Sequence, residues 1–294
     1  MNLGKKIGWR LEALAYDIVG LILQLFPFGA ISAFGGWLLR LIGPLTSKHK
    51  IAKTGLKIAF PEKSEADVTQ ILKDQWDNTG RTFAEFPMTH RVKAFEGSRV
   101  TIKGLDIFKA NAPAIIVTGH FANWEIMATV LTQSGLPVRI TYRKINNPYI
   151  DARVRKQRER YGTKFLVQKS THKGGRELLE ALKNGESIAL LNDQKFNTGL
   201  SVPFFGKEAM TAQGATRLAL KTGRPLLPMA VTRDGANFTV TFYEPIKLEK
   251  TGDRDTDVLN GVKQVSSFIE DRIKETPAQW FWVHRRWPKA LYKK

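Results

Sequence analysis

Residues 114–125 read Ala-Ile-Ile-Val-Thr-Gly-His-Phe-Ala-Asn-Trp-Glu. The run from Ala114 to Thr118 is short, continuous and apolar, and it ends at Gly119-His120. This pattern is typical of a strand that is buried on both faces of a parallel sheet. Residues 123–132 have the pattern of a helix, so the stretch predicts a strand–turn–helix unit with His120 in the turn.

The alternation of strands and helices continues on the carboxyl side of this unit. Short apolar runs predict strands over residues 138–142, 164–168, 187–192, 226–231 and 238–243. Helical patterns cover residues 150–161, 174–183, 213–222 and 256–275. Strands that alternate with helices predict an α/β fold with a mostly parallel sheet flanked by helices.

No internal repeat or linker divides the chain after its N-terminal region. We therefore expect residues 51–294 to form one α/β domain, and residues 66–95 within it have a helical pattern. We expect residues 1–50 to form a helical N-terminal segment that associates with a membrane.

The membrane prediction rests on residues 18–39, which carry no charge and lie between basic flanks. Such a run is just long enough to span a bilayer, which takes about 20 apolar residues. Because Pro27 interrupts it, we favour two amphipathic pieces, 11–26 and 31–41, that lie on the membrane. A buried helical hairpin and one uncleaved spanning helix are the alternatives. No cleavable signal peptide is expected, since the apolar run starts late and follows two acids.

The composition of the 294 residues is that of a globular protein, with 43% hydrophobic and 25% charged residues. The 46 Lys and Arg residues exceed the 27 Asp and Glu residues by 19, which predicts an anionic partner such as a nucleic acid, a membrane or an acidic protein. The chain has no Cys, which excludes disulfides, thiolate metal sites and Cys nucleophiles.

His120 and Glu125 are the first candidates for chemistry, because ligands of open α/β sheets bind at the carboxyl ends of strands. Five residues turn a helix by about 500°, so these two side chains cannot share one helical face. They meet if His120 lies in the turn and Glu125 in the first helical turn, where the carboxylate can hold one imidazole N–H and leave the other nitrogen as a general base. His172 and Glu177 repeat the spacing, and their charged surroundings are typical of a solvated helix start.

The stretch 119–125 resembles the signature of the bacterial lipid A late acyltransferases, lauroyl and myristoyl transferases in the lysophospholipid acyltransferase-like group. Further blocks follow the order of that family over residues 11–289. They are Ala-Phe-Pro-Glu at 59–62, Arg-Thr-Phe-Ala-Glu at 81–85, Tyr-Arg-Lys-Ile-Asn-Asn-Pro at 142–148, Arg-Glu-Arg-Tyr-Gly at 158–162, Leu-Asn-Asp-Gln at 191–194, Pro-Phe-Phe-Gly-Lys at 203–207 and Trp-Phe-Trp-Val-His-Arg-Arg-Trp-Pro at 280–288.

The resemblance implies a glycerolipid-acyltransferase-like fold and the transfer of an acyl chain from an acyl carrier protein thioester to a hydroxyl of a lipid A precursor. No Gly-x-Ser-x-Gly motif occurs, so direct attack by the acceptor, with His120 as the base, is the expected route. Backbone N–H groups after His120, or Arg158, are the expected donors to the oxyanion. Substrate-binding residues are expected at Arg143, Arg158, Asp193 and Gln194, with Asp193 able to orient Arg158 or His120.

The same resemblance sets the expected partners and location. The partners are acyl carrier protein, an anionic glycolipid acceptor and the membrane, with no nucleic acid, metal or cofactor. The location is the cytoplasmic face of the inner membrane. Trp280, Trp282 and Trp287 suit the water–lipid boundary, although core packing is expected for at least one of them.

Three other hypotheses about function remain open. A related enzyme of the same group would acylate a mannolipid, an ornithine lipid or a glycerophospholipid. A nucleic-acid-binding or membrane-surface protein would also explain the basic charge, but zinc-finger spacing, an RNP motif and basic-region heptads are absent. A metal-dependent hydrolase lacks a His-Glu-x-x-His motif or a third ligand near His120.

Overall fold

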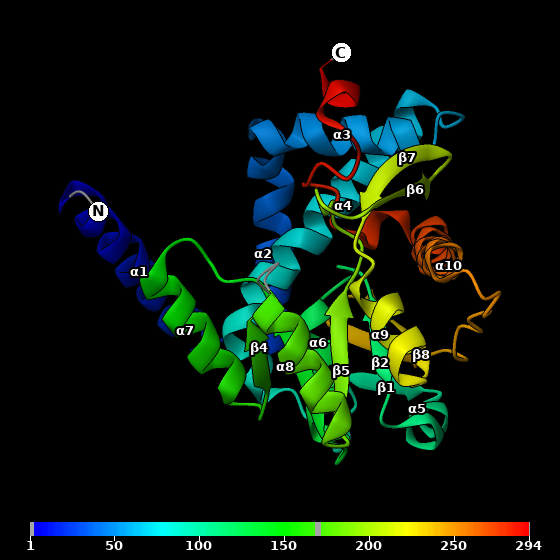
Figure 1. The fold of residues 1–294 in the computed structure, drawn as a ribbon. Helices are drawn as coiled ribbons and strands as arrows, with labels where there is room; N and C mark the ends of the chain where they lie inside the picture. Colours follow the sequence, from blue (N-terminus) through cyan, green and yellow to red (C-terminus); the bar gives the residue numbers. More distant parts are fainter. Residues whose placement is uncertain (1–2, 168–171, 294) are drawn as a thin grey trace.

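The computed structural model describes residues 3–167 and 172–293, and within them the main sheet has seven strands in the order β1-β9-β8-β2-β5-β3-β4 (Figure 1). All neighbours are parallel except β8 and β9. The strands are β1 Val100–Lys103, β2 Ile115–Thr118, β3 Val138–Tyr142, β4 Lys164–Val167, β5 Ser187–Leu191, β8 Leu226–Asp234 and β9 Asn237–Phe242. A separate hairpin joins β6 Leu200–Phe204 to β7 Lys207–Thr211.

The helices cover both faces of this sheet. From β2 the chain moves through α6 to β3 in one direction, and from β4 through α8 to β5 in the other. Because parallel crossovers are right-handed, α6 lies on the face opposite to α8, which stands in front of the sheet in Figure 1. The helices are α1 Leu3–Leu23, α2 Phe28–Ile42, α3 Ser47–Ala59, α4 Glu65–Glu85, α5 Leu105–Asn111, α6 Trp124–Gln133, α7 Pro148–Glu159, α8 His172–Lys183, α9 Gly214–Thr222 and α10 Arg254–Glu275.

The predicted α/β fold is confirmed, and most predicted elements end within a few residues of those observed. Gln168, the expected last residue of one strand, lies outside the described residues. The sequence patterns did not predict α3, β1, α5 or the β6–β7 hairpin. The hairpin turns at Phe205 and Gly206, whose φ angles are 49° and 67°, and a bulky residue in this left-handed region gives little sequence signal.

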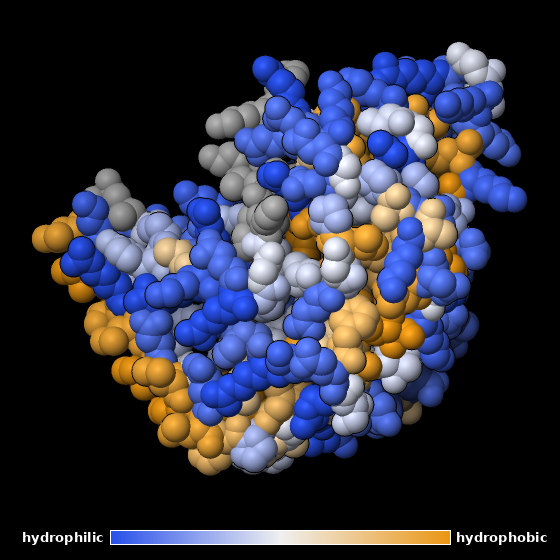
Figure 2. Space-filling view, turned by 90° about the horizontal axis from the view of Figure 1, so that it is seen from below, coloured by the Kyte–Doolittle hydropathy of each residue, from blue (hydrophilic) through white to orange (hydrophobic). Residues whose placement is uncertain are grey.

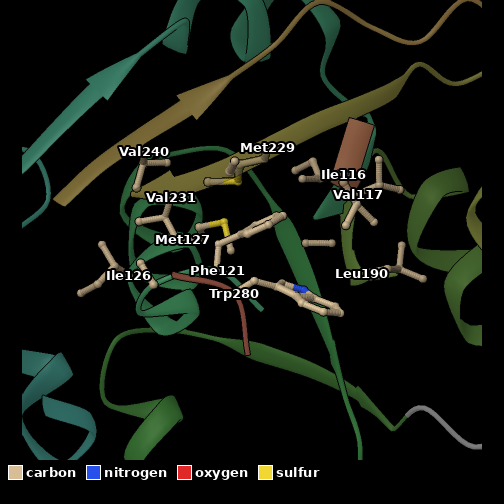
Figure 3. Close-up of a cluster of buried hydrophobic side chains, with 14 of the residues drawn as sticks. Ile116, Val117, Phe121, Ile126, Met127, Leu190, Met229, Val231, Val240 and Trp280 are labelled. Carbon is tan, nitrogen blue, oxygen red and sulfur yellow. The ribbon is translucent and has the colours of Figure 1, made fainter. Parts of the chain in front are cut away.

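The core lies between the sheet and its helices. All four residues of β2 are buried, as expected for a strand covered on both faces. Figure 3 shows buried apolar side chains from α6, from the turn before it and from the neighbouring strands: Ile116, Val117, Phe121, Ile126, Met127, Leu190, Met229, Val231 and Val240.

Trp280, Trp282 and Trp287 are also buried, each with about 1% of its surface exposed. Their suggested place at the water–lipid boundary is therefore wrong for all three. Each indole N–H has a partner inside the protein: Asp193 for Trp280, and the carbonyls of Pro277 and Phe204 for Trp282 and Trp287. Buried Trp is tolerated where its N–H finds such an acceptor.

The uncharged N-terminal run is broken, as the position of Pro27 predicts. Helix α1 ends at Leu23 and α2 begins after Pro27, which caps it in an extended conformation. A single helix over residues 18–39 is thus excluded. A stretch long and apolar enough to cross a membrane by length and composition is Phe28–Leu45, a third of which is buried.

Helix α2 packs tightly across α4 and joins the main core through Phe28 and Ile31. The two backbones touch where Gly35 meets Gly80, since a Cβ atom on Gly80 would lie 2.0 Å from the Gly35 carbonyl oxygen. The boundary expected near residue 50 stays a prediction, although α2 shares its core with the α/β sheet.

Helix α1 instead exposes a long apolar stripe. Its side chains recur at intervals of three and four residues, the spacing of one helical face. They are Leu3, Ile7, Leu11, Leu14, Ile18, Leu21 and Ile22, and Leu25 continues them. Figure 2 shows apolar side chains gathered along the edge of the molecule on which α1 lies. We call these eight residues the α1 stripe.

Gly80→Ala is expected to destabilise the protein, because the new methyl group has no room against the α2 backbone. Overpacking of this kind lowers the free energy of unfolding by about 1–3 kcal/mol. Gly29→Ala, on α2 with no atom within 4 Å of the new Cβ, is the control and is expected to be neutral or stabilising by about 0.4–1 kcal/mol. Thermal denaturation of both variants is the measurement, and equal melting temperatures contradict the prediction.

Candidate active site

The register of two parallel strands brings His120 and Asp193 together. Thr118 of β2 pairs with Leu191 of β5, and the Asn192 N–H donates to the Thr118 carbonyl at 2.8 Å. Two residues beyond each pairing position, the chains leave the sheet side by side. His120 and Asp193 therefore become neighbours although 73 residues separate them.

Asp193 orients the His120 ring. The imidazole Nδ1–H donates to Asp193 Oδ1 at 2.8 Å, and the His120 backbone N–H donates to Oδ2 at 2.8 Å. The Trp280 indole N–H donates to the same Oδ2 at 2.8 Å. Burial raises the pKa of Asp193, but the His120 imidazole and these hydrogen bonds outweigh it and hold the pKa well below its usual range. The ionised carboxylate places the His120 proton on Nδ1 and leaves Nε2 able to accept one.

The expected hydrogen bond between Glu125 and His120 is wrong. Glu125 lies in the first turn of α6, and its carboxylate points to a different group of side chains. Arg158 Nε donates to Oε2 at 3.0 Å, Arg158 Nη2 donates to Oε1, and the Tyr161 hydroxyl donates to Oε2 at 2.7 Å. The physical reason is the turn before α6, which separates the helix from His120 and leaves Asp193 closer to the ring.

Glu125 and Arg158 form a buried, two-pronged ion pair. Burial alone raises the pKa of Glu125, but the Arg158 guanidinium and the Tyr161 hydroxyl outweigh it and keep the pKa below its ordinary value. The guanidinium also lies over the rings of Phe86 and Tyr142, 5.7 and 5.9 Å from their centroids. Lys cannot reproduce this arrangement, in which a planar guanidinium makes two hydrogen bonds to one carboxylate and also stacks on aromatic rings.

Arg143 and Gln194 occupy two different places. Arg143 follows β3 and is exposed, at the carboxyl edge of the sheet. Gln194 comes directly after Asp193, and its side-chain Nε2 lies 3.5 Å from His120 Nε2. The amide thus stands beside the nitrogen that is free to act as a base.

The backbone N–H groups expected to stabilise an oxyanion are already used at three positions. The N–H of His120 donates to Asp193, that of Phe121 to the Gly119 carbonyl at 2.9 Å, and that of Ala122 to the Gln279 carbonyl at 2.7 Å. These N–H groups are therefore not available to an oxyanion, and for the N–H groups that follow Ala122 the expectation stays a prediction.

An apolar cavity of about 50 Å³ lies between α6 and the sheet. Its walls come mainly from α6, β2, β3 and β5, and Glu125, Arg158 and Tyr161 are polar members of its lining. Trp124 also lines it and contacts the His120 ring edge-on, with the ring centroids 5.0 Å apart. The apolar wall residues include Ile116, Met127, Leu131, Ile140, Leu190 and Met229.

Sequence reasoning missed several members of the site. Trp280 donates to Asp193, and Tyr161 donates to Glu125, each from a distant segment of the chain. No local spacing in the sequence predicts either contact. His284 packs edge-on against Trp280 at 5.0 Å, and burial lowers its pKa to about 4, so the ring is neutral at pH 7. Because no acid follows His284 at the five-residue spacing of His120 and Glu125, the sequence analysis assigned it no role.

Arg153 joins α7 to the N-terminal helix α1. Its guanidinium donates to both oxygens of Asp17 on α1, each at 2.6 Å. The Asn147 amide adds hydrogen bonds to the Trp9 carbonyl and to Glu12. Helix α1 is thus fastened by its polar face to the helix that carries Arg158, which leaves the α1 stripe facing outward.

Among the described residues, no group of three or more His, Asp or Glu side chains could hold a metal ion.

Comparison with known proteins identifies the family of the chain. The profile of the family described as bacterial lipid A biosynthesis acyltransferase matches residues 9–289. A lipid A biosynthesis lauroyltransferase of Escherichia coli (strain K12) is 26% identical over 286 residues, 93% of this chain and 90% of the relative. A lipid A biosynthesis palmitoleoyltransferase of the same strain is 26% identical over 82% of this chain and 79% of its own.

A phosphatidylinositol mannoside acyltransferase of Mycobacterium tuberculosis (strain CDC 1551 / Oshkosh) is 25% identical over 68% of this chain and 63% of its own. The match to the family profile covers nearly the whole chain and includes the His120 turn, Arg158, Asp193 and Trp280. The chain is therefore an acyltransferase that belongs to the bacterial lipid A biosynthesis acyltransferase family.

Proposed function

We propose that this enzyme transfers a fatty acyl chain from an acyl carrier protein thioester to a hydroxyl of a lipid A precursor, with His120 as the general base. The observation that carries the proposal is the His120–Asp193 pair, which holds the ring through Nδ1 and leaves Nε2 as the nitrogen that can accept a proton. Trp124, which contacts this ring edge-on, lines the apolar cavity. A base fixed in this tautomer, next to a space for an alkyl chain, suits an attack by a lipid hydroxyl on an acyl donor.

The proposed step needs one proton carrier. The acceptor O–H gives its proton to His120 Nε2 while its oxygen attacks the thioester carbonyl carbon. When the C–S bond breaks, the imidazolium returns the proton to the departing thiolate. Asp193 stabilises the imidazolium between these two events, because its carboxylate stays ionised.

Gln194 is the proposed donor to the oxyanion that forms on the thioester carbonyl. Its amide lies beside His120 Nε2, where the acceptor oxygen and the carbonyl carbon have to meet. Side-chain amides serve as such donors in other acyl-transfer enzymes. Arg158 is less suited, because Glu125 engages its Nε and Nη2 atoms.

The cavity beside α6 is the proposed place for the acyl chain, and the Glu125–Arg158–Tyr161 group is its rigid polar wall. A volume of about 50 Å³ accommodates a few water molecules rather than a long alkyl chain. Binding of the donor therefore requires the side chains around the cavity to move apart.

The charge of the protein supports both partners. An excess of 19 basic residues favours an acidic carrier protein and a phosphorylated lipid, since charge complementarity accelerates encounter. Exposed Arg143, at the carboxyl edge of the sheet, is a proposed contact for an anionic substrate. A second acceptor is a mannosylated lipid, which the similarity to a phosphatidylinositol mannoside acyltransferase favours.

The α1 stripe is the proposed membrane contact, at the cytoplasmic face of the inner membrane, where acyl carrier protein is available. Exposed apolar side chains on one face of a helix with basic flanks are typical of helices that lie in the lipid interface.

His120→Ala is expected to lower the rate of acyl transfer about 10²- to 10⁴-fold, because the reaction loses its base. Asp193→Asn is expected to lose a similar factor, because an amide has only one acceptor oxygen. With that oxygen at the Oδ2 position the NH₂ faces His120 Nδ1 and favours the wrong tautomer, and with it at the Oδ1 position the NH₂ faces two N–H donors. The assay combines acyl carrier protein thioester with a phosphorylated glycolipid or a mannosylated lipid and identifies the product by mass.

His172→Ala is the control for this experiment, because it removes the second histidine that stands five residues before a glutamate. Equal losses from His120→Ala and His172→Ala contradict the role of His120. Failure of the wild-type enzyme with both acceptors contradicts the proposed substrates.

Gln194→Ala is expected to lower kcat about 10²-fold with an unchanged melting temperature, as loss of one oxyanion donor does. Arg158→Lys is expected to lower both the activity and the melting temperature, because it leaves the buried Glu125 carboxylate with an incomplete partner. Arg155→Lys, an exposed position on the same helix, is the control. Normal kcat in Gln194→Ala, together with a kcat loss at constant stability in Arg158→Lys, assigns the oxyanion to Arg158 instead.

Leu11→Glu and Leu14→Glu are each expected to weaken binding to vesicles of phosphatidylglycerol and phosphatidylcholine about tenfold or more. An inserted Leu side chain contributes about 1.5–3 kcal/mol, and about 1.4 kcal/mol corresponds to a factor of ten. Leu291→Glu, at an exposed position near the C-terminus, is the control. Co-sedimentation measures binding, and unchanged binding of both α1 variants contradicts the proposed membrane contact.

A further inference from the structure

The turn after His120 contains a strained residue. Ala122 has a φ angle of 40°, in the left-handed region that residues with a Cβ atom seldom adopt. It stands between His120 and Asn123, the N-cap of α6. A conformation of this kind persists only where the surrounding structure enforces it, and such residues cluster at functional sites.

Three contacts from other elements hold this turn. The Ala122 N–H donates to the Gln279 carbonyl at 2.7 Å. The Thr82 hydroxyl lies 2.9 Å from both the Ala122 carbonyl and the Asn78 carbonyl of its own helix, which share its single proton. The Asn123 amide donates to Glu85 Oε2 at 2.8 Å. Both peptide groups of Ala122, and the cap of the following helix, are thus fixed from outside the turn.

The contacts from α4 lead to a buried ion pair. Arg233 of β8 donates to both oxygens of Glu85, at 2.7 and 2.8 Å, and its Nη2 also donates to the Thr82 hydroxyl at 3.1 Å. The Glu85 side chain is fully buried, and that of Arg233 is 5% exposed. The Ser32 hydroxyl of α2 donates to Glu85 Oε1 at 2.6 Å.

A buried ion pair is a poor source of net stability, because desolvation of the two charges cancels most of their attraction. Thr82, Glu85 and Arg233 do not line the cavity. Within the described part of the chain, the His120 side chain contacts Asp193, Gln194, Trp124 and Phe281 instead. Their combined hydrogen bonds instead converge on Ala122 and Asn123. The turn is therefore held at one end by Asp193, through the His120 N–H, and at the other by this network.

We propose that Thr82, Glu85 and Arg233 are positioning residues that hold the strained turn and thereby fix where His120 Nε2 meets the substrate. The inference rests on the proposed function of His120. The position of His120 matters because a displacement of a catalytic group by about 1 Å can lower the rate about 10²-fold. The Thr82 hydroxyl is the most direct link, since it bonds both Arg233 and the Ala122 carbonyl.

Three single substitutions separate positioning from packing. Thr82→Val keeps the shape of the side chain and removes the hydroxyl, whereas Thr82→Ser keeps the hydroxyl and removes the methyl group. Thr79→Val is the matched control, because Thr79 is equally buried on the same helix and its hydroxyl accepts from Gln75 rather than contacting the turn.

Thr82→Val is expected to lower kcat about 10- to 100-fold with KM unchanged, and Thr82→Ser is expected to stay within about threefold of wild type. Hydrogen exchange measured by mass spectrometry on the peptide that contains Ala122 supplies a readout independent of turnover. Exchange in this peptide is expected to accelerate about tenfold in Thr82→Val and to remain unchanged in Thr79→Val, at similar melting temperatures.

The proposal is overturned if Thr82→Val keeps wild-type exchange around Ala122, or if Thr82→Ser loses more activity than Thr82→Val. It is also overturned if Thr79→Val reproduces the losses of Thr82→Val. Absence of acyl transfer in the wild-type enzyme counts against the proposed function instead, and the exchange experiment then still decides whether Thr82 holds the turn.

Discussion

The parallel pairing of β2 with β5 is the constraint on which the site depends. It places the residues that follow the two strands side by side, so a histidine and an aspartate far apart in the sequence meet. Asp193 is fully buried and accepts three hydrogen bonds from two segments, which keeps its charge tolerable in the interior. A shift of this register by one residue would remove the pair.

Two further buried carboxylates surround the His120 turn. Glu125 holds Arg158 at the polar wall of the cavity, and Glu85 holds Arg233 behind the turn. Ion pairs of this kind seldom add net stability, but each one fixes the relative position of elements that lie far apart in the sequence. The site is thus supported by polar contacts from α4, α7, β8 and the segment after α10, while the apolar core fills the layer between α6 and the sheet.

The N-terminal helices have two different relations to this framework. Helix α2 belongs to the core, because Gly35 and Gly80 allow its backbone to touch α4. Helix α1 is held by polar contacts to α7 and turns its apolar stripe outward. Its Tyr16 is near enough to Arg158 and Glu125 to feel their charges, and burial raises the pKa of Tyr16 to about 12. Helix α1, which carries the proposed membrane contact, thus packs against α7, which carries Arg158 of the polar wall of the cavity.

Local patterns in the sequence were enough to predict the alternating strands and helices, the turn that carries His120 and the break at Pro27. Each of these depends on residues that are close in the chain, through periodicity, apolar runs and proline geometry. The same patterns also indicated an amphipathic first helix with an apolar face, because a run of residues without charge is visible in the local sequence. The tertiary structure alone decided between Asp193 and Glu125 as the partner of His120 and showed that all three of Trp280, Trp282 and Trp287 are buried. It alone also decided the pairing of Arg153 with Asp17 and the support of Ala122 by Thr82. They depend on strand order, register and helix crossings, which bring distant residues together and leave no periodic signal in the residues themselves.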